Sequence, residues 1–92
     1  MESKFLAAWE AARNEAAALG VRIRPVTGDA MAFAHKVLCG HKESDGFWTL
    51  ADMGRLELSL EALVVKKQFT SLFSDEEANN ALNRLLSAGY RF

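Results

Sequence analysis

The chain has one cysteine, one proline and no excess of charge of either sign. Because Cys39 has no second cysteine to pair with, an internal disulfide is excluded, and a small secreted scaffold held together by several bridges is not expected. Eleven basic and twelve acidic side chains leave a formal charge of −1, whereas a dedicated nucleic-acid binder usually carries a basic excess. The composition therefore favours an ordinary globular protein of the cytoplasm.

Long apolar runs are missing as well. No stretch approaches the roughly 20 apolar residues that a membrane-spanning helix needs, and residues 1–5 lack the basic and apolar regions of a signal peptide. We therefore expect no membrane association. With 92 residues, of which 50% are hydrophobic and 25% charged, the chain has the size and composition of a single globular domain spanning residues 1–92.

Amphipathic helical patterns are the main feature that is present. Residues 3–19 are rich in alanine, begin at Ser3 as a candidate N-cap, and stop at Gly20. The apolar side chains of this segment recur at helical spacing, whereas polar ones occupy the other face. The apolar stripe is Phe5, Trp9, Ala12, Ala16 and Leu19, and the polar face includes Glu10, Arg13 and Asn14.

Three further helices are predicted in the middle of the chain. The first follows a turn and a cap at Asp29, carries an apolar face that includes Phe33, and ends at Gly40. A short helix from residue 47 to residue 53 comes next, with Ser44 or Asp45 as its cap. The third opens at Ser59, with Leu60, Leu63, Val64 and, one turn on, Phe69 along one side. Its far end is basic, with Lys66, Lys67 and Gln68 facing solvent.

The most specific local signal is Ser74-Asp75-Glu76-Glu77. It is a capping box, in which the serine hydroxyl accepts from the backbone of Glu77 while that carboxylate reaches back to the serine. An apolar stripe follows at helical spacing, and Gly89 terminates the pattern. The stripe is Ala78, Ala81, Leu82, Leu85 and Ala88.

These patterns predict an all-α fold, a compact bundle of four or five short helices. The alternative is an α+β fold with a small two- or three-stranded sheet drawn from residues 21–26 and 47–58. Val21 and Ile23 alternate with arginines, which is a strand period, but Pro25 removes a backbone donor and marks an edge or a connector.

Few residues offer chemistry. His35, Cys39 and His41 could provide three zinc ligands, yet their spacing matches no established pattern, and a cysteine in an apolar last turn is more often a small core residue. The acidic pair at 76–77 is explained by capping, and we expect the pair Glu57 and Glu61 to be solvated. We therefore predict no catalytic residue, no metal site and no cofactor.

A nucleic-acid role is the main alternative to protein binding. Residues 50–59 resemble two helices joined by a glycine-containing turn. The helix after Ser59 is, however, almost entirely apolar, and Glu61 would repel phosphate, so it is built to be buried rather than to enter a groove. Arg84 and Arg91 could still join other basic side chains in a phosphate-binding patch.

The interaction hypothesis depends on the supply of aromatic side chains. A chain this small has difficulty covering two tryptophans and six phenylalanines, and exposed tryptophan dominates interface energetics. We therefore predict a small, non-catalytic regulatory or interaction protein that binds another protein, or a second copy of itself as a homodimer. The candidate surface comprises Phe47, Trp48, Arg55, Lys66 and Lys67.

Overall fold

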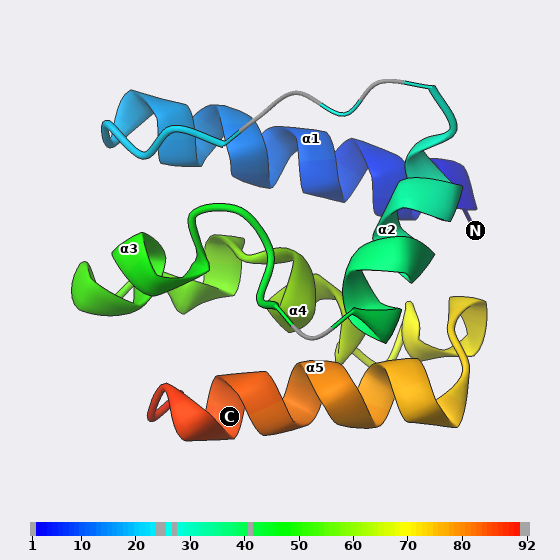
Figure 1. Ribbon diagram of the computed structural model, residues 1–92. Coiled ribbons are helices and arrows are strands. Elements are labelled where there is room, and N and C mark those ends of the chain that lie inside the picture. The colour runs from blue at the N-terminus through cyan, green and yellow to red at the C-terminus, as the bar shows by residue number, and fades with distance from the viewer. Residues whose placement is uncertain (1, 24–25, 27, 41, 91–92) are drawn as a thin grey trace.

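The computed structural model describes residues 2–23, 26, 28–40 and 42–90 (Figure 1). These residues form α-helices and two short 3₁₀ helices, and no strand occurs among them. The elements are α1 (Glu2–Ala18), α2 (Ala30–Cys39), α3 (Phe47–Asp52), η1 (Leu56–Leu58), α4 (Leu60–Val64), η2 (Thr70–Leu72) and α5 (Asp75–Ser87). The predicted all-α class is thus confirmed. None of the helices in this part of the chain is both long enough and apolar enough to cross a membrane.

The α+β alternative is wrong for the residues that can be examined. Residues 21–23 and 26 belong to no strand, and residues 47–58 contain α3 and η1 instead. Phe47 and Leu50 are both buried, and a spacing of three residues brings two side chains to one face of a helix but to opposite faces of a strand. Arg24 and Pro25 lie outside the described residues.

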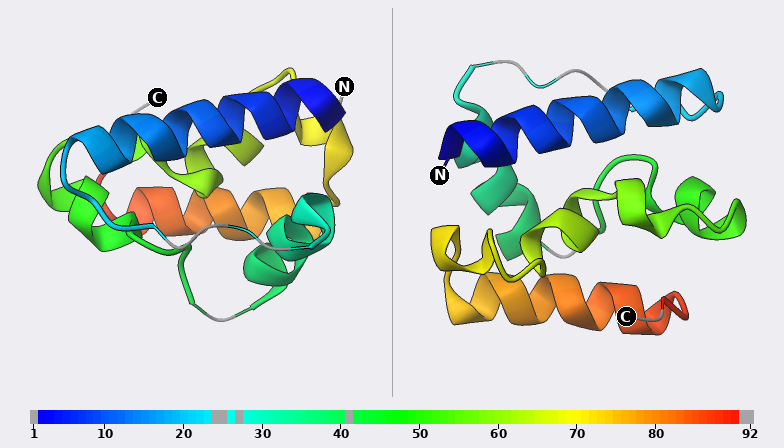
Figure 2. Two further views of the ribbon diagram at one scale, coloured as in Figure 1. Left: turned by 90° about the horizontal axis from the view of Figure 1, so that it is seen from above. Right: turned by 180° about the vertical axis from the view of Figure 1, so that it is seen from behind.

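The helices stack in three levels (Figures 1 and 2). The two longest, α1 and α5, run in the same direction on opposite sides of the molecule, and α3, η1 and α4 lie between them. The steeply inclined α2 closes one end and contacts both α1 and α5. This arrangement buries α4 from both sides.

One hydrophobic core runs through all these elements. Every residue of α4 is buried, and Phe5 of α1 is fully enclosed. The Phe5 ring meets three other aromatic rings at centroid distances of 5.2–6.0 Å, namely those of Trp9, Phe69 and Phe73. Aromatic rings at such tilted or edge-on angles add to the free energy gained from burial.

Most predicted helix ends are confirmed. Asp29 accepts from the backbone N–H of Met31 at 3.0 Å, and Ser59 accepts from that of Ala62 at 3.2 Å. The capping box at Ser74 is complete, with both reciprocal hydrogen bonds present. After α1, Gly20 adopts a φ of 89°, and the backbone N–H of the next residue bonds back to α1.

Two predicted caps are wrong. The first helix begins at Glu2, so Ser3 lies inside it rather than at its N-cap. The cap of α3 is Gly46, which has a φ of 78° and no side chain to offer. Ser44 is turned to a different partner, the carboxylate of Glu61.

Candidate binding face

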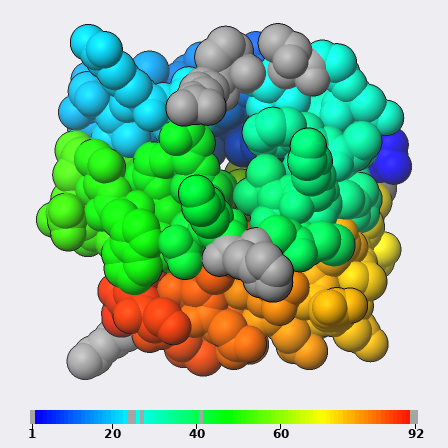
Figure 3. All heavy atoms as spheres, in the orientation of Figure 1, coloured from blue at the N-terminus to red at the C-terminus, as the bar shows by residue number. Residues whose placement is uncertain are grey.

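A partly enclosed hollow lies between α1, α2 and residues 42–46 (Figure 3). We call it the recess. It has a volume of about 450 Å³, which is within the range of pockets that hold small ligands. Its lining residues among those described are Trp9, Arg13, Ile23, Val26, Phe33, Val37, Lys42, Glu43, Ser44, Asp45, Leu58, Ser59 and Leu60.

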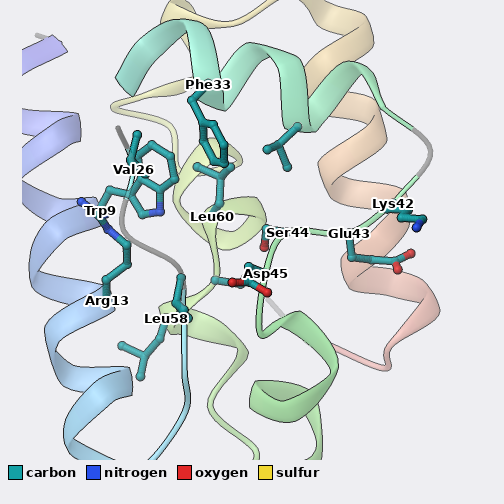
Figure 4. A pocket seen from close by; sticks show the side chains of 13 residues that line it. Trp9, Arg13, Val26, Phe33, Lys42, Glu43, Ser44, Asp45, Leu58 and Leu60 are labelled. Atoms are coloured by element: carbon teal, nitrogen blue, oxygen red, sulfur yellow. The ribbon is translucent and has the colours of Figure 1, made fainter. Parts of the chain in front are cut away.

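Trp9 and Phe33 form the aromatic wall of the recess (Figure 4). Their rings are stacked at a centroid distance of 6.2 Å, although they come from α1 and α2. Trp9 is 5% exposed, whereas Phe33 is 41% exposed. Phe33 was expected on the inward face of its helix, but it stands at the edge of the recess because α2 crosses α1 at a steep angle (Figure 1).

Arg13 supplies positive charge to the same wall. Its guanidinium carbon lies 5.1 Å from the centroid of the Trp9 ring, in cation–π contact. The two residues are four apart on α1 and therefore share a face. Arg13 was expected on the solvent-facing side of the helix, and the structure corrects this, because its side chain lines the recess and its Nε is buried.

Residues 42–46 form the opposite wall and are held by a buried ion pair. The backbone N–H and the hydroxyl of Ser44 both donate to the carboxylate of Glu61, at 2.8 and 2.5 Å. Arg84 approaches that carboxylate at 3.2 Å, with the two side chains 9% and 0% exposed. The expectation that Glu61 is solvated is therefore wrong, since its position in α4 faces the core.

Arg84 also joins α5 to the end of α2. Its guanidinium donates to the carbonyl oxygens of Val37 and Gly40 at 3.1 and 2.8 Å. Carbonyl groups at a helix C-terminus have no partners within the helix and need such donors. Arg84 therefore holds the end of α2 and, through Glu61, is linked to Ser44 in the 42–46 wall.

Trp48 stands on the far side of the same segment. The residue is 50% exposed, and its indole N–H donates to the carboxylate of Glu43 at 3.0 Å. Its ring meets that of Phe47 edge-on at 5.2 Å. Residues 42–46 therefore separate the recess from a second, shallower hollow that Trp48 lines.

The predicted surface residues differ in burial and lie in different elements. Phe47 is 1% exposed and belongs to the core, because it is the first residue of α3 on the side that faces the interior. Arg55 donates to Glu57 and Glu15 at 2.7 and 2.8 Å, which ties it to α1. Lys66 and Lys67 are exposed in the turn after α4, so the prediction that they form the far end of this helix is wrong, because α4 ends at Val64.

The histidine and cysteine cluster is organised around a carboxylate. His35 lies 2.6 Å from Glu77, and the Cys39 thiol donates to the same oxygen at 3.7 Å. Cys39 is exposed, so its expected place in the core is wrong. Desolvation and the adjacent carboxylate raise the pKa of the Cys39 thiol, and a raised pKa disfavours the nucleophilic thiolate.

Metal binding has no support at this cluster. Within the described part of the chain, no three acidic, histidine or cysteine side chains are placed to share a metal ion. His41, the third ligand considered from the sequence, lies outside the described residues. The carboxylate of Glu77 accepts hydrogen bonds both within this cluster and from the backbone of Ser74, where it completes the capping box of α5.

The sequence predicted that Trp48 is a partly exposed side chain, which the structure confirms, but it missed the recess. A cation four residues after a tryptophan in a helix is a sequence signal for the contact between Arg13 and Trp9. The positions of Phe33 and of residues 42–46 at the recess depend instead on how α2 packs. Comparisons with protein-family models, curated proteins and solved structures found no match to this chain.

Proposed function

We propose that this chain is a non-catalytic binding protein that recognises another protein through the surface around Trp48. The observation that carries the proposal is that Trp48 is half exposed and yet held in place. Its N–H is bonded to Glu43 and its ring rests on Phe47. We further propose that the protein acts in the cytoplasm, where a free thiol such as Cys39 is the usual state of cysteine.

A fixed aromatic side chain suits binding better than a mobile one. Ordering an interfacial side chain opposes association by about 0.5–1.5 kcal/mol, and the contacts of Trp48 have already met that requirement in the unbound protein. Its large apolar ring can then contribute its burial to the complex. Tryptophan is also among the residues most often found at the energetic centre of interfaces.

A non-catalytic role is supported by the way the buried acidic side chains are used. Among the described residues, the buried carboxylates are those of Glu61 and Glu77. Each already accepts several hydrogen bonds that hold structural elements together. General acid–base catalysis needs a group that can exchange a proton with a substrate, and these two are committed elsewhere.

No observation among the described residues favours the nucleic-acid alternative. A helix-turn-helix protein places its second helix in the major groove, and here that helix would be α4. All five residues of α4 are buried, so it has no face to present to a nucleic acid.

Trp48→Ala tests the proposal, with Leu86→Ala as the matched control. Leu86 is equally apolar at the surface, 55% exposed, but lies on α5. We expect Trp48→Ala to lose either self-association in sedimentation or the specific capture of a partner from an extract of the source cells, while Leu86→Ala behaves as the unaltered protein. Identical profiles for all three proteins would contradict the proposal.

A further inference from the structure

We propose that the recess is a binding site for a small organic anion, a flat apolar ring system that carries a carboxylate. This inference goes beyond protein recognition, because Trp48 does not line the recess and the two activities can fail separately. It depends on three features of the recess, which are its shape, its aromatic wall and the state of Arg13.

The shape and the wall favour a flat apolar ligand. The recess has a volume of about 450 Å³. Its walls are formed by Trp9, Phe33 and aliphatic side chains (Figure 4). One aromatic side chain of the wall, Phe33, is 41% exposed, so the recess offers uncovered aromatic surface. An aromatic ring placed there could stack on Phe33 and bury the apolar faces of both.

Arg13 favours a negative charge on that ligand. Among the residues that the structure describes, the guanidinium of Arg13 has the Trp9 ring as its neighbour but no carboxylate within ion-pair distance. Its Nε is buried with no hydrogen-bond partner. A guanidinium that has no carboxylate partner can donate two parallel hydrogen bonds to the carboxylate of a ligand.

The other charged groups at the recess are Lys42, Glu43 and Asp45. Glu43 already accepts from Trp48, and Asp45 has an interaction of its own. Both carboxylates are therefore engaged, whereas Arg13 has no acceptor within the described part of the chain. Lys42 adds a second positive charge on the segment that faces Arg13 across the recess. Among the described residues, the charged side chains at the recess that have no hydrogen-bonding partner are therefore the positive ones, Arg13 and Lys42.

The test follows the indole N–H signals of the ¹⁵N-labelled protein by nuclear magnetic resonance. The chain has two tryptophans, so Trp9 reports on the recess and Trp48 serves as an internal control. Three probes of equal size are titrated, namely 2-naphthoate, the neutral 2-naphthamide and the cationic 2-naphthylmethylammonium. We expect 2-naphthoate to shift Trp9 saturably and to bind at least ~10-fold more tightly than the amide, a difference of about 1.4 kcal/mol.

Two arginine variants separate charge from shape. Arg13→Gln should bring the affinity for 2-naphthoate down to that for the amide. Arg55→Gln should leave both affinities unchanged, because Arg55 is paired with Glu15 and Glu57 outside the recess. Val37→Trp, which fills the recess from α2, should abolish binding of all three probes, and it keeps the test decisive if Arg13→Gln does not fold.

The proposal is overturned by equal affinities for the three probes, by tighter binding of the cation, or by the absence of a saturable shift of Trp9. It is also overturned if the dominant shift occurs at Trp48. Because none of these measurements involves a protein partner, their failure would leave the role of Trp48 to its own test.

Discussion

At the scale of single residues, the buried pair of Arg84 and Glu61 joins three helices, α2, α4 and α5. Arg84 satisfies a buried carboxylate and the last carbonyl groups of α2 at once. Removing it leaves a negative charge enclosed in the core, since Glu61 is 0% exposed. Breaking one side of such a pair is strongly destabilising, although the intact pair contributes little net free energy.

We predict that Arg84→Ala lowers the free energy of unfolding by about 3–5 kcal/mol. Chemical denaturation followed by circular dichroism measures the change. Arg55→Ala is the control, because its ion pairs are exposed to solvent, and we expect no resolvable loss from it. Similar losses in the two variants would show that the buried pair has no special role.

The carboxyl group of Glu77 makes the free energy of unfolding depend on pH. Desolvation tends to raise the pKa of its carboxyl group, but hydrogen bonds from the Ser74 backbone and from His35 outweigh this and leave the pKa below its usual range. A pKa depressed in the folded state contributes stability that is present above the unfolded value, about 4.3. That stability is lost as pH falls through the lower folded value.

We therefore expect the free energy of unfolding to fall between about pH 5 and pH 3, with part of the fall due to Glu77. Glu77→Gln should flatten the profile in this window, while Glu76→Gln, at an exposed neighbour, should not. Parallel profiles for Glu77→Gln and the unaltered protein would contradict the assignment. Denaturant titrations at closely spaced pH values provide the measurement.

The sequence correctly predicts the contacts of a residue where its partner is close in the chain. Ser74 and Glu77 form their capping box within one turn, and Gly20 ends its own helix. It failed for Glu61 and Arg84, whose partners are 17 to 47 residues away. Such partners are set by the packing of α4, α2 and α5, which local patterns do not encode.

At the scale of elements, Gly46 determines how the 42–46 wall joins α3. It adopts a left-handed conformation, with φ at 78°. A Cβ at this position would lie 3.0 Å from a side-chain carbon of Ile23 and 3.1 Å from one of Val21. Both the conformation and the close approach therefore require glycine.

We predict that Gly46→Ala destabilises the protein more than Gly54→Ala. Gly54 is also left-handed, at 70°, but nothing lies within 4 Å of its Cβ position. Gly54→Ala should therefore report the conformational term alone, about 1–2 kcal/mol, and Gly46→Ala should add the crowding against Val21 and Ile23. Thermal unfolding of the two variants gives the comparison, and an equal loss would exclude crowding at the wall.

Element patterns also explain why the middle of the chain was ambiguous. Residues 47–58 are short, apolar and interrupted by Gly54, and short apolar runs do not distinguish helix from strand by their period. The left-handed conformation of Gly46 before α3 and the burial of both Phe47 and Leu50 distinguish a helix from a strand in this segment. The first of these features is a backbone angle, which is visible only in the structure.

At the scale of the whole molecule, α4 and the aromatic cluster of Phe5 hold the layers together. Phe5 contacts rings from α1 itself and from the segment around η2. Since small domains are only marginally stable, with about 5–15 kcal/mol in total, the loss of one central ring threatens the entire fold.

We predict that Phe5→Ala lowers the free energy of unfolding by about 3–5 kcal/mol. Phe33→Ala is the control, because Phe33 is aromatic but 41% exposed at the edge of the recess. It should lose much less and retain the dispersed amide spectrum of a folded protein. If the two variants unfold at the same denaturant concentration, the cluster around Phe5 is not the centre of the core.

We propose that the surface around Trp48 contacts a partner protein. Site-specific photo-crosslinking tests it most directly, with p-benzoylphenylalanine placed at position 48 in one variant and at position 86 in another, since both side chains are about half exposed. Irradiation in the source cells should give a discrete adduct, or a crosslinked dimer, from position 48 and none from position 86. The same products from both positions, or none from position 48, would contradict the claim.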